Sequence, residues 1–321
     1  MTTIIQLSYL VAAVLFILGL QGLSSPKTAS RGNLMAAVGM LIAVVATLLV
    51  QGVINYWVVL AGIVVGSGLG AVLALRIQMT AMPQMVALLN GFGGAASTLV
   101  ASAELSNSVV NELPLVGIVP FAIVLSVLIG SITLTGSLVA FAKLQELVGG
   151  AAVTYPLQQV SNGLIGVLAI GLCVALTLDP SNFGAFGGLV GVALLLGVLL
   201  VIPIGGADMP VVISLLNSYS GLAACATGFV LDNSALVISG GLVGASGLIL
   251  TKIMCDAMNR SLGNVLFGAF GAVDQTAAGG SGAVAEQGNV TAYTPIDAAV
   301  IFSSARSVVI VPGYGMAVAH A

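Results

Sequence analysis

Short polar connections divide the chain into stretches of about 20 apolar residues, each long enough as a helix to cross the hydrocarbon core of a bilayer. Hydrophobic residues make up 59% of the chain and charged residues only 5%, whereas soluble domains carry about 25% charged residues. The pattern therefore predicts an all-α polytopic membrane helix bundle with about nine transmembrane helices. The predicted spans are Ile4–Leu23, Leu34–Val50, Trp57–Leu75, Met85–Ala103, Leu115–Phe141, Gly163–Leu178, Phe183–Ile204, Met209–Leu231 and Ser234–Met254.

In the membrane region, basic residues occur only in alternate connections between these spans and, as Lys252 and Arg260, at the end of the ninth span. The connections after the second, fourth, sixth and eighth spans contain neither Lys nor Arg. Because Lys and Arg gather on the cytoplasmic side of membrane proteins, we expect an extracytoplasmic N-terminus and a cytoplasmic C-terminus. The basic residues of the membrane region are Lys27, Arg31, Arg76, Lys143, Lys252 and Arg260.

Charge and cysteine content argue against several classes of partner. The net charge is −3 and basic residues form no cluster, so we expect no nucleic-acid partner. Cys173, Cys225 and Cys255 lie in or beside apolar segments and form no CxxC pair. We therefore expect neither a disulfide framework nor a metal site.

Small residues recur at helical spacing within several spans. Gly66 and Gly70 lie four residues apart in the third span, and Gly240 and Gly244 do so in the ninth. Such pairs let helix backbones approach closely in lipid, so we expect most of the glycines to serve helix packing.

Three spans each place small and polar residues on one helical face. Asn90 and Asn217 lie on two of these faces, each about 13 Å from the predicted cytoplasmic end of its helix and thus near the bilayer centre. The predicted faces are Asn90, Gly94 and Ser97 in the fourth span, Ser126, Gly130, Thr133 and Ser137 in the fifth, and Ser214, Asn217 and Gly221 in the eighth.

Two interpretations of the intramembrane asparagines are open. Their amides could hydrogen-bond neighbouring helices together, or they could hold a chain of water molecules between helices. The core of the predicted spans contains neither a carboxylate nor a histidine. A proton path through this chain would therefore need a titratable group from a partner.

Asp208 and Arg260 lie at the predicted cytoplasmic ends of the last two spans. An acid at the start of a helix is also favoured simply by the helix dipole. A basic residue after a span is also typical of a plain cytoplasmic anchor. Because Arg260 lies between the last span and the C-terminal segment, movement of either part could be transmitted through it.

The composition changes after Gly271. Residues 272–294 are small and polar, which is typical of a flexible linker. Thr294 as N-cap and Pro295 at the first position predict a short helix to Ser304. A strand over Ser307–Val311 and a glycine turn over Gly313–Val318 then predict the start of a Rossmann-like α/β domain. We expect a transmembrane domain (1–271), a linker (272–294) and the truncated start of a nucleotide-binding domain (295–321).

Five segments carry a resemblance to a known family: "KLQELV", "IGGADMPVVISLLNSYSG", "GGLVGASG", "IMCDAMNRS" and "VPGYGMAVAHA". The chain resembles, over its whole length, the β subunits of proton-translocating NAD(P) transhydrogenase. The resemblance implies a bacterial inner-membrane enzyme that couples hydride transfer between NAD(H) and NADP(H) to proton translocation. It also implies a partner α subunit that binds NAD(H), activity only in the full-length complex, and a homodimer of αβ units.

The resemblance assigns roles to particular residues. Asn217 matches the membrane asparagine of the family's proton path, and Asp208 matches the acid at its cytoplasmic mouth. Arg260 and Ser261 match the segment that couples the membrane domain to the nucleotide domain. The NADP(H) fingerprint corresponds to Gly313, Tyr314, Gly315, Met316, Ala317 and Val318.

Two positions depart from the family pattern: His320, where the family usually has Gln, and Asn90. Many members carry a histidine in a fourth-span segment like "LHSF", where this chain reads "LLNGF" with Asn90. The resemblance then implies that an α-subunit helix supplies the proton-carrying histidine.

Two other functions are compatible with the composition: a secondary transporter or channel with an unrelated C-terminal tail, and a structural subunit of a larger membrane complex.

Overall fold

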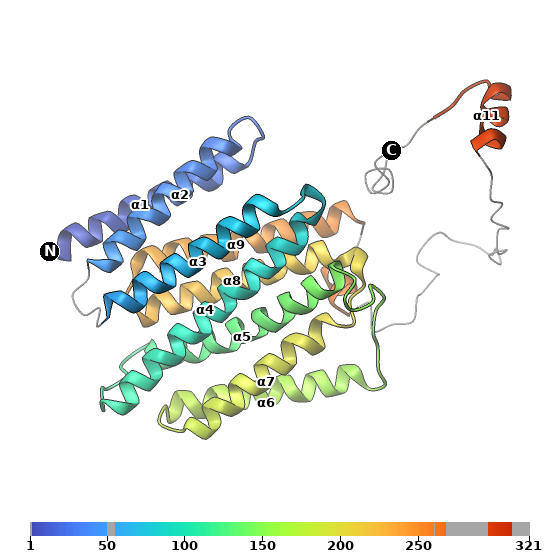
Figure 1. Cartoon of the computed structure of the whole chain (residues 1–321). Helices are drawn as coiled ribbons and strands as arrows, with labels where there is room; N and C mark the ends of the chain where they lie inside the picture. The colour runs from blue at the N-terminus through green and yellow to red at the C-terminus, as the bar shows by residue number, and fades with distance from the viewer. Residues whose placement is uncertain (1, 50–54, 260, 268–294, 310–321) are drawn as a thin grey trace. The chain divides into compact units, whose positions relative to one another are not determined.

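The computed structural model describes residues 2–49, 55–259, 261–267 and 295–309, and it divides into two units, Met1–Ala272 and Val273–Ala321. Within the described residues it is all-helical, with nine helices long and apolar enough to cross a membrane (Figure 1). The predicted membrane helix bundle is confirmed. The helices of the first unit are α1 (Thr2–Leu23), α2 (Ala29–Leu48), α3 (Tyr56–Arg76), α4 (Met82–Val110), α5 (Val119–Leu144), α6 (Gln158–Leu178), α7 (Phe183–Val201), α8 (Met209–Val230), α9 (Ser234–Ala257) and the short α10 (Leu262–Phe267), with 3-10 turns η1 (Met79–Ala81) and η2 (Gly206–Asp208).

Helices α5 and α8 form the centre of the bundle. In the most apolar stretch of each helix, more than half of the residues are buried: 56% in α5 and 61% in α8 with its preceding turn η2. Helices α4 and α7 pack against α5, and α9 and α4 pack against α8. Helix α6 packs outside α7, and the α1–α2 pair reaches the bundle through α9 (Figure 1).

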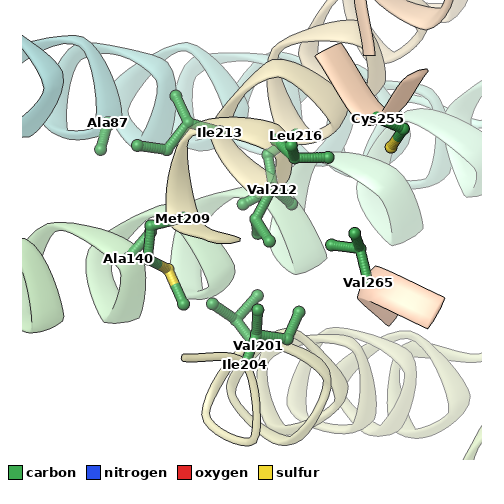
Figure 2. Close-up of a cluster of buried hydrophobic side chains, with 11 residues drawn as sticks. Ala87, Ala140, Val201, Ile204, Met209, Val212, Ile213, Leu216, Cys255 and Val265 are labelled. Atoms are coloured by element: carbon green, nitrogen blue, oxygen red, sulfur yellow. The ribbon is translucent and has the colours of Figure 1, made fainter. Parts of the chain in front are cut away.

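Apolar side chains from six elements meet around the first turns of α8. Met209 and Val212 of α8 lie in one buried cluster with Val201 at the end of α7 and Val265 of α10 (Figure 2). Packing of this cluster positions the connection between α7 and α8. That connection contains Asp208.

Glycine allows the central helices to approach one another closely. A Cβ built on Gly130 of α5 would lie 2.7 Å from the Gly94 carbonyl oxygen and 2.5 Å from Thr98 Oγ1, both on α4. A Cβ on Gly240 of α9 would lie 2.8 Å from the Gly221 carbonyl oxygen of α8. The predicted packing role of the Gly240 pair is confirmed, because real Cβ atoms do not tolerate such distances.

The packing role predicted for Gly66 and Gly70 does not hold among the described residues. A Cβ on either glycine would meet nothing within 4 Å, and every described residue of α3 remains accessible. Helix α3, which links α2 to α4 in the chain, packs extensively against none of the described helices.

The second unit contains α11 (Pro295–Ser304), which confirms the predicted short helix with Pro295 at its first position. The predicted strand over Ser307–Val311 is absent from its described part, residues 307–309. A strand needs a pairing partner, and the described part of this unit offers none. The N-cap Thr294 and the glycine turn Gly313–Val318 lie outside the described residues.

The contrast between packed and open glycines gives a matched test. We expect Gly130→Ala to destabilise the protein by about 1–3 kcal/mol, because the added Cβ overpacks the α4–α5 contact. Gly66→Ala should leave stability unchanged or slightly raised, because its Cβ meets open space and alanine favours helix. Thermal unfolding of both purified variants in detergent measures the difference. Equal melting temperatures would show that the α4–α5 contact is looser than described.

Candidate functional site

A groove of about 580 Å³ opens between the α1–α2 pair and helices α4, α8 and α9. Its wall includes both intramembrane asparagines, Asn90 of α4 and Asn217 of α8, together with the hydroxyl groups of Ser97, Ser220 and Ser239. The remaining lining residues are small or apolar: Phe16, Leu20, Ala36, Met40, Val86, Leu89, Gly93, Gly221, Ala224, Leu236, Gly240, Leu242 and Val243.

Asn90 is held in the wall by two neighbouring helices. Its Nδ2 donates to Ser137 Oγ of α5 at 2.9 Å, and Ser220 Oγ of α8 donates to its backbone oxygen at 3.3 Å. The side chain is 8% exposed, and that exposure is toward the groove. Asn90 is therefore oriented by the protein while it keeps contact with the cavity.

Asn217 lies one helical turn before Ser220 and differs from Asn90 in its surroundings. The side chain is exposed into the groove and makes no hydrogen bond to any other described residue. Both asparagines are eight residues from the start of their helices, which corresponds to a depth of about 12 Å. Two amides at the same depth thus lie in one groove, one fixed and one free to bind what enters it.

The predicted polar faces of α4 and α5 contact each other. Ser126 Oγ donates to the Ser97 backbone oxygen at 3.3 Å. Beside these predicted faces, Thr98 Oγ1 also lies 3.4 Å from Ser131 Oγ. With the Asn90–Ser137 bond, these contacts extend along the length of the α4–α5 interface. Most of this polarity is therefore hydrogen-bonded between helices.

The polar face predicted on α8 points mainly elsewhere. Ser214 accepts a hydrogen bond from Thr251 of α9 at 3.0 Å, and Gly221 packs against Gly240 of α9. The face of α8 that meets α4 and α5 instead carries Ser220 and Thr227, the latter 2.7 Å from Ser126 Oγ. Sequence analysis missed this second face, although the seven-residue spacing of these two hydroxyls is a helical signal.

The other predicted site residues lie away from the groove or outside the described residues. Asp208 ends the 3-10 turn η2 and is half-buried at the N-cap of α8. Ser261 is exposed immediately before α10. Arg260 and the fingerprint residues Gly313, Tyr314, Gly315, Met316, Ala317 and Val318 lie outside the described residues.

The chemistry available to the groove is limited to hydrogen bonding. Its described lining contains no Asp, Glu, His, Lys or Arg. Asparagine and serine side chains both donate and accept hydrogen bonds, so they can order water molecules, but they do not change charge near neutral pH. Proton transfer through the groove would need a titratable side chain from outside this set of residues.

Comparison with known proteins gives a consistent match. A model of the family described as NAD(P) transhydrogenase beta subunit matches residues 5–321. Two curated proteins are called NAD(P) transhydrogenase subunit beta, one from Rhodospirillum rubrum and one from its strain ATCC 11170. Each is 47% identical to this chain over 319 residues. Each match covers 98% of this chain and 68% of the relative.

Proposed function

The chain belongs to the NAD(P) transhydrogenase beta subunit family, and we propose that it couples hydride transfer between NAD(H) and NADP(H) to proton movement across the membrane. The observation that carries the coupling proposal is the groove that brings Asn90 and Asn217 together at one depth. The family match includes the C-terminal segment, which argues against a transporter with an unrelated tail.

In this proposal the groove receives a helix of the α subunit. The groove is open along the flank of the chain, and Asn217 has a free amide there. A polar side chain exposed to lipid costs free energy, so a partner helix with a complementary polar residue would stabilise the assembly. That helix would supply the titratable group that the described lining lacks.

The roles of the asparagines follow from their different contacts. Asn90, fixed by Ser137 and Ser220, would hold a water molecule in a constant position. Asn217 would orient the partner's titratable side chain. Asp208 at the start of α8 would connect this centre with the cytoplasm, and Arg260 and Ser261 would transmit the state of the nucleotide domain.

The nucleotide site belongs to the C-terminal part of the chain in this proposal. Residues 1–271 translocate protons, 272–294 form a linker, and 295–321 begin the NADP(H)-binding domain, with the pyrophosphate against Gly313–Val318. The α subunit binds NAD(H), hydride passes between the two nicotinamides, and the active form is a dimer of αβ units in the bacterial inner membrane.

Substitution of Asn217 separates coupling from packing. In the complete αβ complex, we expect Asn217→Leu to reduce proton-coupled reverse transhydrogenation by about tenfold or more, because the amide that orients the proton carrier is lost. Cyclic hydride exchange, which needs no net proton movement, should fall much less. Both rates, measured in proteoliposomes beside the melting temperature of the complex, test this expectation.

Asn162 provides the matched control. Its Nδ2 donates to the Leu199 backbone oxygen of α7 at 3.4 Å, and its Oδ1 accepts from Tyr155 at 3.0 Å, so it serves interhelical bonding. Asn162→Leu should lower the melting temperature and depress both activities together. The same parallel loss in Asn217→Leu would refute its role in the proton path and leave it as a packing residue.

The proposed nucleotide turn predicts a binding defect. We expect Gly315→Val in the full-length protein to weaken NADPH binding by about tenfold or more, because a side chain at this glycine blocks the close approach of the backbone to the pyrophosphate. Fluorescence titration with NADPH measures the affinity. Normal binding would show that the fingerprint lies elsewhere.

The proposed orientation predicts opposite labelling of two connections. Lys27 lies between α1 and α2, Asn111 follows α4, and both are exposed. We expect an impermeant maleimide to label Asn111→Cys from the outside of intact spheroplasts and Lys27→Cys only after the membrane is opened. The unaltered protein controls for its three native cysteines. Labelling of both sites from one side would contradict the nine-span arrangement.

A further inference from the structure

Lys143 is the one charged side chain among the described residues that is buried, with 2% exposure. From the last turn of α5, its Nζ donates to the backbone oxygens of Ala151 at 3.0 Å, Ile202 at 2.5 Å and Ile204 at 2.8 Å. An ammonium group has three N–H donors, so each donor has an acceptor. The charge therefore has no need of an acidic partner to be accommodated.

The three acceptors belong to two connections that lie far apart in the sequence. Ala151 lies between α5 and α6, whereas Ile202 and Ile204 lie between α7 and α8. Ile202 is the C-cap of α7, where the helix dipole presents partial negative charge to a cation. Lys143 thus joins the end of α5 to the end of α7 and to the α5–α6 connection.

Backbone contacts continue this junction toward Asp208. Val153 N donates to the Ile202 oxygen at 3.4 Å, and Gly206 N donates to the Gly150 oxygen at 2.9 Å. Gly206 is the first residue of η2, which ends at Asp208. The side chains of Ile204 and Met209, on either side of η2, are buried in the cluster of Figure 2. Only a short turn therefore separates the carbonyls bound by Lys143 from Asp208.

We propose that Lys143 is a positioning residue whose ammonium group fixes the connections 145–157 and 202–208 to each other and so holds Asp208 at the start of α8. The effect on coupling rests on the proposed function, whereas the effect on the two connections does not. A basic residue that marks the side of the membrane by its charge needs no protein partner and would be exposed, as Lys252 is. Burial with three backbone acceptors instead indicates a specific structural link.

Hydrogen exchange in the complete αβ complex tests the link directly. In Lys143→Met, amides of 145–157 and 202–208 should exchange about ten- to a hundredfold faster, because hydrogen bonds to a charged group stabilise closed states by that factor. Exchange in the middle of α5 and α8 should not change. Lys252→Met, which removes an exposed lysine of α9, should leave both connections protected.

Kinetics of the same complexes test the consequence. Proton-coupled turnover of Lys143→Met should fall about tenfold relative to cyclic hydride exchange, since a displaced functional group costs that much or more. Unchanged exchange in the two connections would refute the link, and a parallel fall of both activities would refute the positioning role. Failure of the proton path itself would appear as intact coupling in Asn217→Leu, with faster exchange in Lys143→Met still present.

If Lys143→Met fails to assemble, Lys143→Arg decides the question. The guanidinium group keeps the positive charge and supplies N–H donors to the same carbonyls. Exchange in both connections should then stay within about threefold of the unaltered complex, with the ratio of coupled to cyclic turnover retained. Loss of protection in an assembled Lys143→Arg complex would overturn the proposal.

Discussion

The bundle depends on backbone contact between helices at glycine. In lipid the hydrophobic effect does not drive helices together, so dispersion contacts and interhelical hydrogen bonds must do so. Gly94 and Gly130 let α4 and α5 touch, and Gly221 and Gly240 do the same for α8 and α9. This closeness places Thr98 Oγ1 of α4 3.4 Å from Ser131 Oγ of α5, and it lets Ser218 Oγ of α8 donate to the Gly244 backbone oxygen of α9. The polar contacts of the centre are therefore available only because the backbones approach so closely.

Polar groups of the membrane region fall into two classes by what they contact. Those at the α4–α5 and α5–α8 interfaces bond to neighbouring helices, as Ser97 and Ser126 do. Asn217 faces the groove and bonds to no other described residue. An unsatisfied amide at this depth is costly, so it marks the surface that a partner is expected to cover. Asn90 belongs to both classes, because it bonds to Ser137 and also lines the groove.

Sequence analysis predicted the spans well because apolar length is a local property. It also placed the polar faces of α4 and α5, since a helical repeat follows from spacing alone. It could not decide which face of α8 meets which neighbour, because Ser214 and Ser220 are equally polar and only tertiary packing distinguishes them. The same limit explains Gly66, whose spacing resembles that of Gly240 although no described residue lies against it. Lys143 was interpreted as a marker of one membrane side, and its burial depends on carbonyls about 60 residues away.

The polarity of the central helices also bears on how the chain enters the membrane during synthesis. Of the nine described spans, α4 and α8 have the lowest mean hydropathy, whereas α3 and α7 have the highest. Helix α3 can partition into lipid on its own apolarity. Helix α8 carries polar faces that α4, α5 and α9 cover in the finished bundle. Because α9 follows α8 in the sequence, α8 leaves the ribosome before α9 does. Its stable residence in lipid therefore requires the earlier helices to remain nearby until α9 also enters the membrane.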